Sequence, residues 1–403
     1  IGLTGPGSAS VWHRSTRTSG PTDMRLLHVH DVPRFEGGVE QILYDTALGL
    51  AECGWSQALL HSDGQSPDSK FVSAFSSCDS SADMIARFRP HAILMHKVAD
   101  RDRVDQCGKT APTLHMVHDH DLYCPRRHKY FPLSKKICTK PAGAACYQHL
   151  CCIQRAPADS ILPVRLSGTG AVNAMLDAST GIRRYIVGSH YMKEQLKLNG
   201  ISEEKISIVN PVPAALASPR YIAMQQQPEI LFVGQVIRGK GVDLLLRALA
   251  KVSGPWKATI VGTGNHLEAC KQLASKLNIA GRVVFTGRID HEKLESYYAA
   301  ARVVVVPSRW PEPFGMVGIE AMSRGRPVVA FDSGGISDWL DDQVTGLLVP
   351  PADISELAKA VQHLLDNPEI ADHMGRRAAD HVEQSFSHNN YLDQMKETME
   401  SLR

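Results

Sequence analysis

The stretch SRWPEPFGMVGIEAMSRGRPV, residues 308–328, contains two glutamates eight positions apart, Glu312 and Glu320. Glu312 lies in an expected loop between two prolines, and Glu320 lies in the first turns of an expected helix. Carboxylates accept hydrogen bonds, and the backbone N–H groups at a helix start favour anions. Two carboxylates at this place raise the question of what they bind. The alternatives are a simple loop charge at Glu312 and an exposed first-turn glutamate at Glu320.

A second stretch with chemical potential is VGQVIRGKGVD, residues 233–243, which places Arg238 and Lys240 in a glycine-rich turn between a strand and a helix. Two cations at a helix N-terminus oppose the helix dipole, which is unfavourable unless an anion binds there. The turn therefore predicts phosphate binding. A solvated surface turn is the alternative.

The segment RFEGGVEQ, residues 34–41, carries the pair Gly37 and Gly38 between the first expected strand and a helix. Glycines let the backbone approach a ligand closely, and the helix N-terminus offers N–H groups to phosphate. A tight turn without a ligand explains this stretch equally well. The segment is not GxGxxG, and no other strand ends in that pattern, so a dinucleotide-dependent dehydrogenase is disfavoured.

The segment HDHDLYCPRRHKYFPLSKKICTKPAGAACYQHLCC, residues 118–152, is rich in thiols. No CxxC pair is present, so the spacing does not match a common zinc finger. A structural zinc or similar metal, disulfides, and free thiols in an acceptor-side loop all remain open. The five cysteines concerned are Cys124, Cys138, Cys146, Cys151 and Cys152.

The same segment also carries basic and aromatic side chains, which can meet an anionic acceptor or a membrane surface. A solvated lysine-rich loop is the plainer interpretation, and we prefer it slightly. These side chains are Arg126, Arg127, Lys129, Tyr130, Phe131, Lys135 and Lys136.

Length and charge restrict the class of protein. A chain of 403 residues is too long for one ordinary core, so two domains are expected, and a net charge of +2 gives no reason to expect nucleic acid as a partner. No run approaches the roughly 18 apolar residues of a membrane-spanning helix. The uneven cysteines do not resemble the framework of a small secreted domain, so we expect a cytoplasmic protein.

The candidate residues follow short apolar runs that alternate with helical patterns. Such buried strands indicate parallel sheets covered by helices on both faces, and in such sheets ligands bind at the carboxyl ends of the strands. The rhythm stops in a stretch rich in Pro, Ala and Gln and then restarts, which predicts two such domains in tandem. The expected strands begin the segments 24–32, 91–98, 113–118, 184–200, 229–236, 257–264, 282–289, 301–308, 326–335 and 345–351.

We therefore expect an α/β protein with the following division of the chain. Residues 1–23 would be a tag or disordered leader, with Met24 as the natural start. The expected parts are an N-terminal Rossmann-like acceptor domain at 24–208 with the cysteine-rich insertion 118–152, a linker at 209–228, a C-terminal Rossmann-like donor domain at 229–385, and a helix at 386–403 that packs back on the first domain.

Taken together, these motifs resemble the retaining GT-B glycosyltransferases of family 4, over roughly residues 24–390. The resemblance rests on the glycine pair, the VG…KG turn, VGTG, FTGRI and above all the stretch around Glu312 and Glu320, which matches the E-x7-E signature with its flanks. It implies the GT-B fold, in which two Rossmann-like parallel-sheet domains face each other across an interdomain cleft.

The resemblance also implies roles for single residues. Glu312 would hold the hydroxyls of the donor sugar, and Glu320 the ribose hydroxyls. Lys240 and Arg238 would stabilise the leaving diphosphate, although this chain has Gln235 where the family often has arginine. His118, at the end of an expected strand, would contact the donor sugar and help to orient the reacting centre.

The remaining donor-binding positions follow from the same resemblance. They are glycines at strand ends, the segment after FTG, and the backbone N–H groups before and at the start of the helix that holds Glu320. These positions are Gly37, Gly38, Gly234, Gly262, Gly264, Gly287, Arg288, Ile289, Phe314, Gly315, Met316 and Val317.

The implied reaction is transfer of a sugar, with retention, from a UDP-, GDP- or ADP-sugar to a glycan, lipid-linked or other acceptor, without a cofactor or an active-site metal. Front-face attack is the usual proposal, and double displacement through Glu312 is the alternative. The protein would be cytoplasmic, with peripheral contact at the inner face of the membrane as one option. A GT-B enzyme with a small-molecule acceptor and a non-catalytic nucleotide-sugar-binding protein remain alternative functions.

Overall fold

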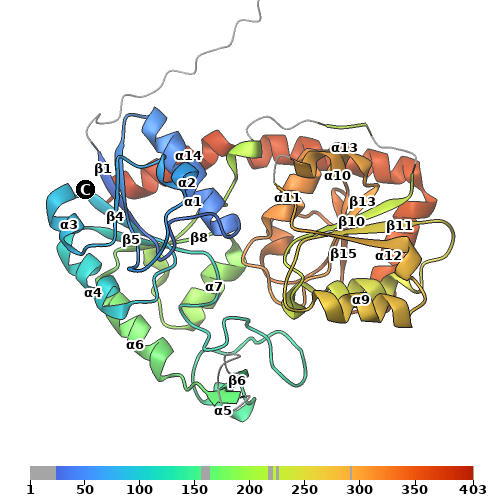
Figure 1. Ribbon diagram of the computed structural model, residues 1–403, viewed down its shortest axis with the longest axis horizontal. Coiled ribbons are helices and arrows are strands. Elements are labelled where there is room, and N and C mark those ends of the chain that lie inside the picture. Colours follow the sequence, from blue (N-terminus) through green and yellow to red (C-terminus); the bar gives the residue numbers. More distant parts are fainter. Residues whose placement is uncertain (1–23, 156–163, 217–220, 224–226, 291–292, 403) are drawn as a thin grey trace, which may run out of the picture.

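The computed structural model describes residues 24–155, 164–216, 221–223, 227–290 and 293–402. The leader expected at residues 1–23 lies outside this part of the chain. Two domains stand side by side in Figure 1, with the N-terminal one in blue and green and the C-terminal one in yellow and orange. Within the described ranges, no helix combines the length and the apolar character needed to cross a membrane.

The N-terminal domain is built on a seven-stranded sheet with the order β3-β2-β1-β4-β5-β8-β9, whose pairs are all parallel. The strands expected in the segments 24–32, 91–98, 113–118 and 184–200 are present as β1, β4, β5 and β8. Their apolar residues are buried on both faces, as expected for a parallel sheet between helices. The strands are β1 (Arg25–Val29), β2 (Ser56–Leu60), β3 (Ser77–Asp79), β4 (Ala92–Met95), β5 (Thr113–Val117), β8 (Arg184–Val187) and β9 (Ile206–Ile208).

Helices cover both faces of this sheet (Figure 1). Side-chain caps fix several of their starts: Asp100 accepts from the backbone of Asp102 and Arg103, and Ser189 accepts from Met192. The helices are α1 (Gly38–Glu52), α2 (Ser69–Val72), α3 (Asp83–Phe88), α4 (Arg101–Thr110), α6 (Gly170–Ala178), η1 (Ser179–Gly181), α7 (His190–Leu198), η2 (Glu203–Lys205) and η3 (Ala214–Leu216).

The cysteine-rich insertion forms a small lobe below the N-terminal domain in Figure 1. It contains the short helix α5 (Ala144–Gln148) and an antiparallel pair of strands, β6 (Ile153–Arg155) and β7 (Val164–Leu166). The lobe is connected to the sheet through the segment that follows β5.

The C-terminal domain repeats the design with a six-stranded parallel sheet of order β12-β11-β10-β13-β14-β15. All six strands expected after the linker are present. They are β10 (Glu229–Val233), β11 (Lys257–Val261), β12 (Val283–Gly287), β13 (Val303–Val306), β14 (Val328–Phe331) and β15 (Gly346–Val349).

The helices of this domain carry apolar faces toward the sheet, most clearly α8, whose leucines 244–246 and 249 are buried. Asp353 caps α12 by accepting from Ser355 and Glu356. The helices are η4 (Arg238–Lys240), α8 (Val242–Leu249), α9 (Leu267–Lys276), η5 (Ala280–Arg282), α10 (Leu294–Ala300), α11 (Met316–Ser323), η7 (Gly335–Asp338), α12 (Ile354–Asp366) and α13 (Pro368–Ser385).

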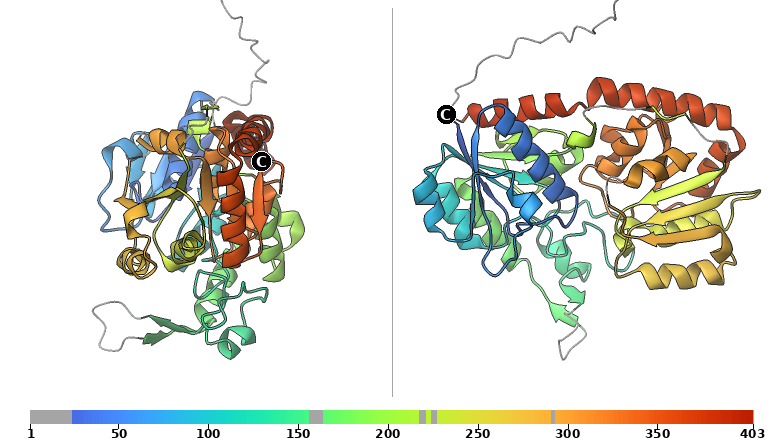
Figure 2. Two further views of the ribbon diagram at one scale, coloured as in Figure 1. Left: turned by 90° about the vertical axis from the view of Figure 1, so that its right-hand side faces the viewer. Right: turned by 45° about the horizontal axis from the view of Figure 1, so that its top comes forward.

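The last helix, α14 (His388–Glu400), leaves the C-terminal domain and lies on the first one, as the red ribbons of Figure 2 show. The Tyr391 hydroxyl lies 2.6 Å from Thr46 Oγ1 of α1, and Leu392 packs against Gly49 of the same helix. His388 Nδ1 lies 2.7 Å from the carbonyl oxygen of Val212. One buried apolar cluster continues through this crossing, from Met116 of β5 to side chains of β13 and β14.

The sequence prediction of an α/β fold with two Rossmann-like parallel-sheet domains is therefore confirmed. In both sheets the strand order reverses beside the first strand, between β1 and β4 and between β10 and β13. Loops that leave the carboxyl ends of strands at such a reversal diverge and form a crevice in which ligands bind. These loops are the candidate positions for a functional site.

Replacement of Gly318 by alanine is expected to destabilise the C-terminal domain, because a Cβ there would lie 1.9 Å from Trp339 Cη2. The Trp339 ring cannot move freely, since its Nε1–H donates to the carbonyl of Phe314 at 2.6 Å. We expect Gly318→Ala to lower the free energy of unfolding by about 1–3 kcal/mol, measured by urea denaturation.

The matched control is Gly281→Ala, where an added Cβ meets no atom within 4 Å. The control is expected to change stability by less than about 0.5 kcal/mol. Equal stability of the two variants would contradict the close packing of α11 on Trp339.

Candidate functional site

The two charged motifs of the C-terminal domain meet in a direct ion pair. Lys240 Nζ lies 2.7 Å from Glu312 Oε1 and 2.9 Å from Oε2. Ser308 Oγ donates a short hydrogen bond to the same carboxylate, and the Lys240 ammonium lies 5.2 Å from the centre of the Trp310 ring. Glu312 is only 3% exposed, so its charge is balanced inside the protein.

The backbone of the Glu312 loop is fixed by the loop after β14. Glu312 N–H donates to Ser333 O at 3.1 Å, and Gly335 N–H donates to Glu312 O at 2.7 Å. Gly334 has a φ of 75°, and a Cβ there would lie 2.3 Å from Glu312 O. The glycine pair of FDSGG is therefore needed because two backbones touch at this point.

Helix α11 begins directly after this loop, at Gly315, whose φ of 100° favours glycine. No side chain caps the helix, so the first backbone N–H groups, including those of Met316 and Val317, point out of the helix start. One turn further on, Glu320 is buried, and its Oε2 accepts from the Tyr298 hydroxyl at 3.1 Å.

The glycine pair of the N-terminal domain lies against the start of α11. A Cβ on Gly38 would come within 2.4 Å of Met316 Cε, so glycine allows this close approach of the two domains. Glu40 holds the glycine loop, because its Oε2 accepts from Gly37 N–H at 2.7 Å and its Oε1 lies 3.1 Å from His30 Nε2. Burial alone would raise the pKa of Glu40, but the hydrogen bond and charge of His30 lower it overall.

Two further side chains of the N-terminal domain bind the carbonyls on either side of Glu312. His120 Nε2 lies 2.9 Å from Pro311 O, and Ser189 Oγ donates to Pro313 O. His120 is fully buried, and its Nδ1 lies 2.7 Å from the Tyr123 hydroxyl. The loop that carries Glu312 is thus held by hydrogen bonds from both domains.

His118 lies where β5 ends and is the last member of a chain of hydrogen-bonded side chains. Its Nε2 lies 3.0 Å from His96 Nδ1, and His96 Nε2 lies 3.2 Å from His28 Nδ1. His28 Nε2 in turn lies 2.9 Å from Gln57 Oε1, while Gln57 Nε2 donates to Ala47 O at 2.6 Å. The chain therefore begins at an amide whose orientation is set by a backbone carbonyl.

This arrangement determines the tautomer of each imidazole. Burial lowers the pKa of His28 to about 4 and that of His118 to about 3, and burial together with the neighbouring histidines lowers the pKa of His96 well below its usual range. The rings are therefore neutral at pH 7, with one donor and one acceptor nitrogen each. Because Gln57 Oε1 can only accept, every ring donates through Nε2, and His118 keeps an unprotonated Nδ1.

His118 also lines a cleft of about 740 Å³ that lies entirely in the N-terminal domain. The cleft opens at the carboxyl ends of β1, β4 and β5, and the start of the insertion and α6 form its other walls. Its lining includes His30, Glu40, Lys97 and Asp119. A substrate that entered this cleft would reach His118 at the strand end.

The structure does not bring Arg238 together with Glu312 and Lys240. Its side chain lines a separate pocket of about 440 Å³, with Lys135, Arg247, His266 and Arg309 among the other lining residues. The Arg238 carbonyl accepts from Arg309 Nη1 at 2.6 Å. The role expected for the Arg238 guanidinium beside the leaving diphosphate stays a prediction.

The other predicted donor-binding glycines lie at neighbouring strand ends. Gly262 N–H donates to Gly287 O at 2.8 Å, and a Cβ on Gly262 would lie 1.8 Å from Gly234 O. A Cβ on Gly264 would similarly come within 2.5 Å of Val236 O. Close packing of these loops explains the glycines at 262 and 264, whereas at Gly234 the φ of 149° favours glycine. Arg288 is exposed, and Ile289 packs against the core.

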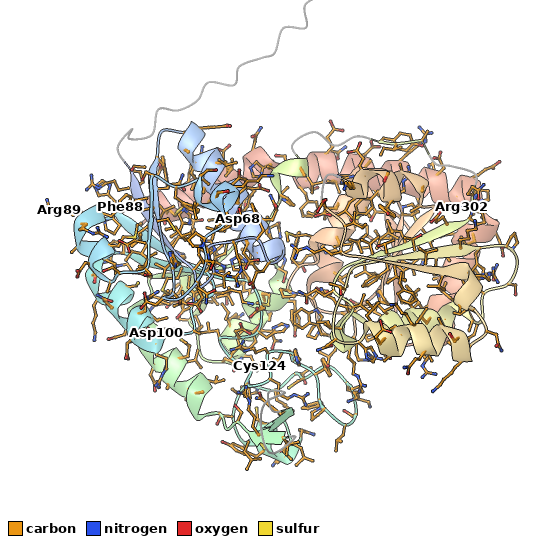
Figure 3. All side chains as sticks on the ribbon, viewed as in Figure 1. Asp68, Phe88, Arg89, Asp100, Cys124 and Arg302 are labelled. Carbon is orange, nitrogen blue, oxygen red and sulfur yellow. The ribbon has the colours of Figure 1, made fainter. Side chains whose placement is uncertain are left out.

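Four of the five cysteines of the insertion gather around one small cavity, and all five are free thiols. Figure 3 labels Cys124, which lies where the insertion meets the N-terminal domain. Nothing in the described parts of the chain groups three or more His, Cys, Asp or Glu side chains in a way that could hold a metal ion. A structural zinc, one of the three alternatives left open for these cysteines, is therefore not supported.

The chemistry of this cavity gives the physical reason. Lys129 Nζ lies 3.9 Å from Cys138 Sγ, so an ammonium group already occupies the place where a dication would be needed. Burial raises the pKa of Cys151 to about 11 and also raises that of Cys146. These groups remain neutral thiols at pH 7, whereas zinc is bound by thiolates.

Comparison with known proteins points to sugar transfer. Residues 219–381 match the family model described as Glycosyl transferases group 1. Alpha-D-kanosaminyltransferase of Streptomyces kanamyceticus is 34% identical over 159 residues, which are 39% of this chain and 41% of that protein. GDP-mannose-dependent alpha-(1-6)-phosphatidylinositol monomannoside mannosyltransferase of Mycolicibacterium smegmatis is 32% identical over 232 residues, 54% of this chain and 60% of that protein. The chain thus spans about half the length of the curated relatives it matches.

Solved structures show the fold. Sucrose-phosphate synthase of Thermosynechococcus elongatus superposes with a TM-score of 0.72 at 22% identity, over 94% of this chain and 99% of that one. HepE of Anabaena in complex with UDP-glucose superposes with a TM-score of 0.70 at 17% identity, over 94% and 100% of the two chains. The expected GT-B fold is therefore confirmed.

Several residues of the site have no motif that would have identified them. His28, His96 and Gln57 lie on strands of apolar character, and only the repeated histidines at strand ends, HVH and MVH, could have indicated a polar chain. His120 stands two positions after His118 and contacts the other domain instead of the cleft. Ser189 fits the pattern of a helix N-cap, but this pattern does not predict its second contact, to Pro313 O.

We expect the histidine chain to make stability depend on pH. His28 and His118 have folded pKa values far below the usual 6.5, so the unfolded state binds more protons in acid. The contribution of these histidines to the free energy of unfolding is therefore fully present above about pH 6.5. It falls as the pH decreases toward 4, by about 1.4 kcal/mol per pH unit for each such histidine. Urea denaturation between pH 4.5 and 7.5 measures this slope.

The variant His96→Gln tests this prediction, because the amide can keep one donor and one acceptor while it cannot titrate. Its slope is expected to be shallower than that of the wild type by the share of one histidine, whereas His373→Gln, at an exposed position on α13, should keep the wild-type slope. Identical slopes for all three proteins would contradict the burial of neutral imidazoles.

Proposed function

We propose that the protein is a retaining glycosyltransferase of family 4, which transfers a sugar from a nucleotide-diphosphate sugar to a glycan, lipid-linked or other acceptor. One observation carries this proposal: the start of α11, with Glu312 and Lys240 beside it, lies against the Gly37–Gly38 loop of the other domain. An uncapped helix start at an interdomain contact suits an anionic ligand that reaches both domains. The group 1 family match over residues 219–381 supports the same activity.

The donor would lie with its diphosphate at the start of α11. The free N–H groups of Met316 and Val317 and the Lys240 ammonium are the cationic or partly positive groups there, and together they would stabilise the charge that develops as the diphosphate leaves. Glu320 lies one turn further along the helix, on the side of the ribose. The chain supplies these charges from its own groups, so we propose a reaction without an active-site metal.

The surroundings of Glu312 favour front-face attack over double displacement. A nucleophilic carboxylate needs a free lone pair that points at the anomeric carbon. Both oxygens of Glu312 lie within 2.9 Å of Lys240 Nζ, and Ser308 donates to one of them. We therefore assign Glu312 to holding the donor sugar, and the leaving phosphate to accepting the proton of the acceptor.

His118 and the N-terminal cleft complete the proposal. The unprotonated Nδ1 of His118 would accept a hydrogen bond from a hydroxyl of the donor sugar, which orients the ring without adding charge. The acceptor would enter through the cleft that His118 lines, in the cytoplasm, where contact with the inner face of the membrane would bring a lipid-linked acceptor within reach. The nucleotide base stays open, because one relative is GDP-mannose-dependent and one GT-B structure holds UDP-glucose.

A thermal-shift panel of UDP, GDP, ADP and their common sugars, with and without EDTA, tests the donor site. A ligand at 100 times its dissociation constant adds about 2.7 kcal/mol of stability. One nucleotide series should raise the melting temperature, with or without EDTA. Glu320→Ala should reduce this shift, whereas Glu397→Ala, at an exposed position on α14, should not. A folded protein that responds to no nucleotide would favour a non-catalytic role.

Sugar transfer itself distinguishes Lys240 from Arg238. With the stabilising nucleotide sugar and a panel of acceptors, Lys240→Met is expected to lower kcat by about 100- to 1000-fold, because it removes the cation beside the leaving group. Arg238→Met, whose side chain lines another pocket, is expected to retain most of the activity. Product NMR gives the anomeric configuration, and an inverted product would refute the retaining assignment.

A further inference from the structure

The cleft of the N-terminal domain contains carboxylates and cations in almost equal number, but only the carboxylates are all engaged. Glu40 is bound by Gly37 and His30, and Glu36 is paired with Arg34 at 2.7 Å. Asp119 lies 2.6 Å from Lys97 Nζ. Asp31 accepts from the Ser62 hydroxyl and from Ala99 N–H. The negative charges of the wall therefore have partners within the protein.

Asp121 is the last of these carboxylates, and it has cations on two sides. It lies 3.7 Å from Lys97 Nζ and 3.5 Å from Arg127 Nε. Burial and the neighbouring Asp119 raise the pKa of Asp121 to about 6, so its carboxylate is protonated more readily than an ordinary aspartate. It does not neutralise the rest of the basic wall.

Arg126 differs from every group named so far, because two of the three nitrogens of its guanidinium are buried without a partner. Its Nε and Nη1 are inaccessible to solvent and make no hydrogen bond, and no salt bridge to it occurs within the described ranges. Arginine cannot lose its proton in a protein, so this charge cannot be removed by titration. A buried, unpaired charge costs free energy that only an anion or a hydrogen-bond acceptor can recover.

The nearby thiols cannot serve as that anion. Arg126 also lines the small cysteine cavity, together with Cys151. Burial raises the pKa of the Cys151 thiol to about 11, so this group is neutral at pH 7. The described residues around Arg126 therefore supply no anion for its guanidinium.

A second guanidinium lies on the same wall. Gln154 Nε2 donates to Pro125 O at 2.5 Å, next to Arg126, and its Oε1 accepts from Arg165 Nη2 at 3.2 Å. Gln154 thus ties Arg165, from β7, to the loop that carries Arg126, and all three residues line the cleft. Guanidinium groups bind phosphate and carboxylate oxygens in pairs of parallel hydrogen bonds.

We propose that Arg126 and Arg165 form an oxyanion subsite in this cleft and that the acceptor of the transfer reaction carries a phosphate or carboxylate group that binds there. The subsite itself follows from the unpaired guanidinium, whereas its use by an acceptor rests on the proposed function. Neutral glycans without such a group would be poor acceptors. The insertion, which supplies Arg126, would then select the acceptor by charge.

Isothermal titration with inorganic phosphate and, separately, with acetate tests the subsite at constant ionic strength set by chloride, because salt screens exposed cations. The nucleotide that stabilises the protein is present at saturation, so that the start of α11 is not available to phosphate. We expect one of the two anions to bind the wild type, and to bind Arg126→Gln roughly tenfold to a hundredfold more weakly. The anion that binds more tightly identifies the oxyanion.

The matched control is Arg377→Gln, which removes the same charge from an exposed position on α13 and should bind the anion as the wild type does. Stability gives a second readout. Without added anion, Arg126→Gln should be at least as stable as the wild type, because it no longer buries an unpaired charge. A guanidinium with a purely structural role would give the opposite result.

The possible outcomes separate the two proposals. Equal binding by the wild type and Arg126→Gln, or no binding of either anion by the wild type, would overturn the oxyanion subsite. If no nucleotide binds, the proposed transferase activity fails, and the same titration without nucleotide still decides the subsite. If the subsite binds its anion but only uncharged acceptors are glycosylated, the link between the subsite and the acceptor is wrong.

Discussion

The structure of the site depends on three consecutive residues, Pro311 to Pro313. The carbonyls of the two prolines accept hydrogen bonds from His120 and Ser189 of the N-terminal domain. The carboxylate between them binds Lys240 of its own domain. The backbone of the same tripeptide is bonded to Ser333 and Gly335. A shift of one domain against the other would therefore move the carboxylate. The geometry of the site thus depends on the relative position of the two domains.

The two domains satisfy their buried polar groups in different ways. The C-terminal domain pairs full charges, as Lys240 with Glu312 and Arg309 with Asp243, which keeps the helix start beside them uncommitted. The N-terminal domain also contains ion pairs, such as Lys97 with Asp119, but beside them burial keeps a chain of imidazoles neutral, and one amide sets their orientation. A neutral donor–acceptor chain can hold a ring rigidly without the desolvation cost of an ion.

The sequence allowed the six strands of the C-terminal sheet, four strands of the N-terminal sheet and the start of α11 to be predicted, because apolar runs and glycines mark them locally. The N-terminal strands β2, β3 and β9 were not among the expected ones. The sequence did not show that Lys240 and Glu312 bind each other, since that contact joins two loops 72 positions apart. The same limit applies to Arg238, whose turn was correctly placed but which lines another pocket. The zinc alternative was based on the number of cysteines, and the sequence did not show that Lys129 lies among them. His96 and Gln57 have roles that only the packing of three parallel strands creates.

The Lys240–Glu312 pair also sets a condition on how a donor can bind. An ammonium group has three hydrogens, and in the free protein at least one is directed at Glu312, with both oxygens within 2.9 Å. A diphosphate at the start of α11 would compete for the same hydrogens, so the sugar hydroxyls must replace part of what Glu312 loses. Binding of the nucleotide without its sugar would leave Glu312 buried and short of donors, which costs free energy. Under the proposed function, the pair would therefore favour the intact nucleotide sugar over the free nucleotide, which is the order of affinity that a transferase needs in order to release its product.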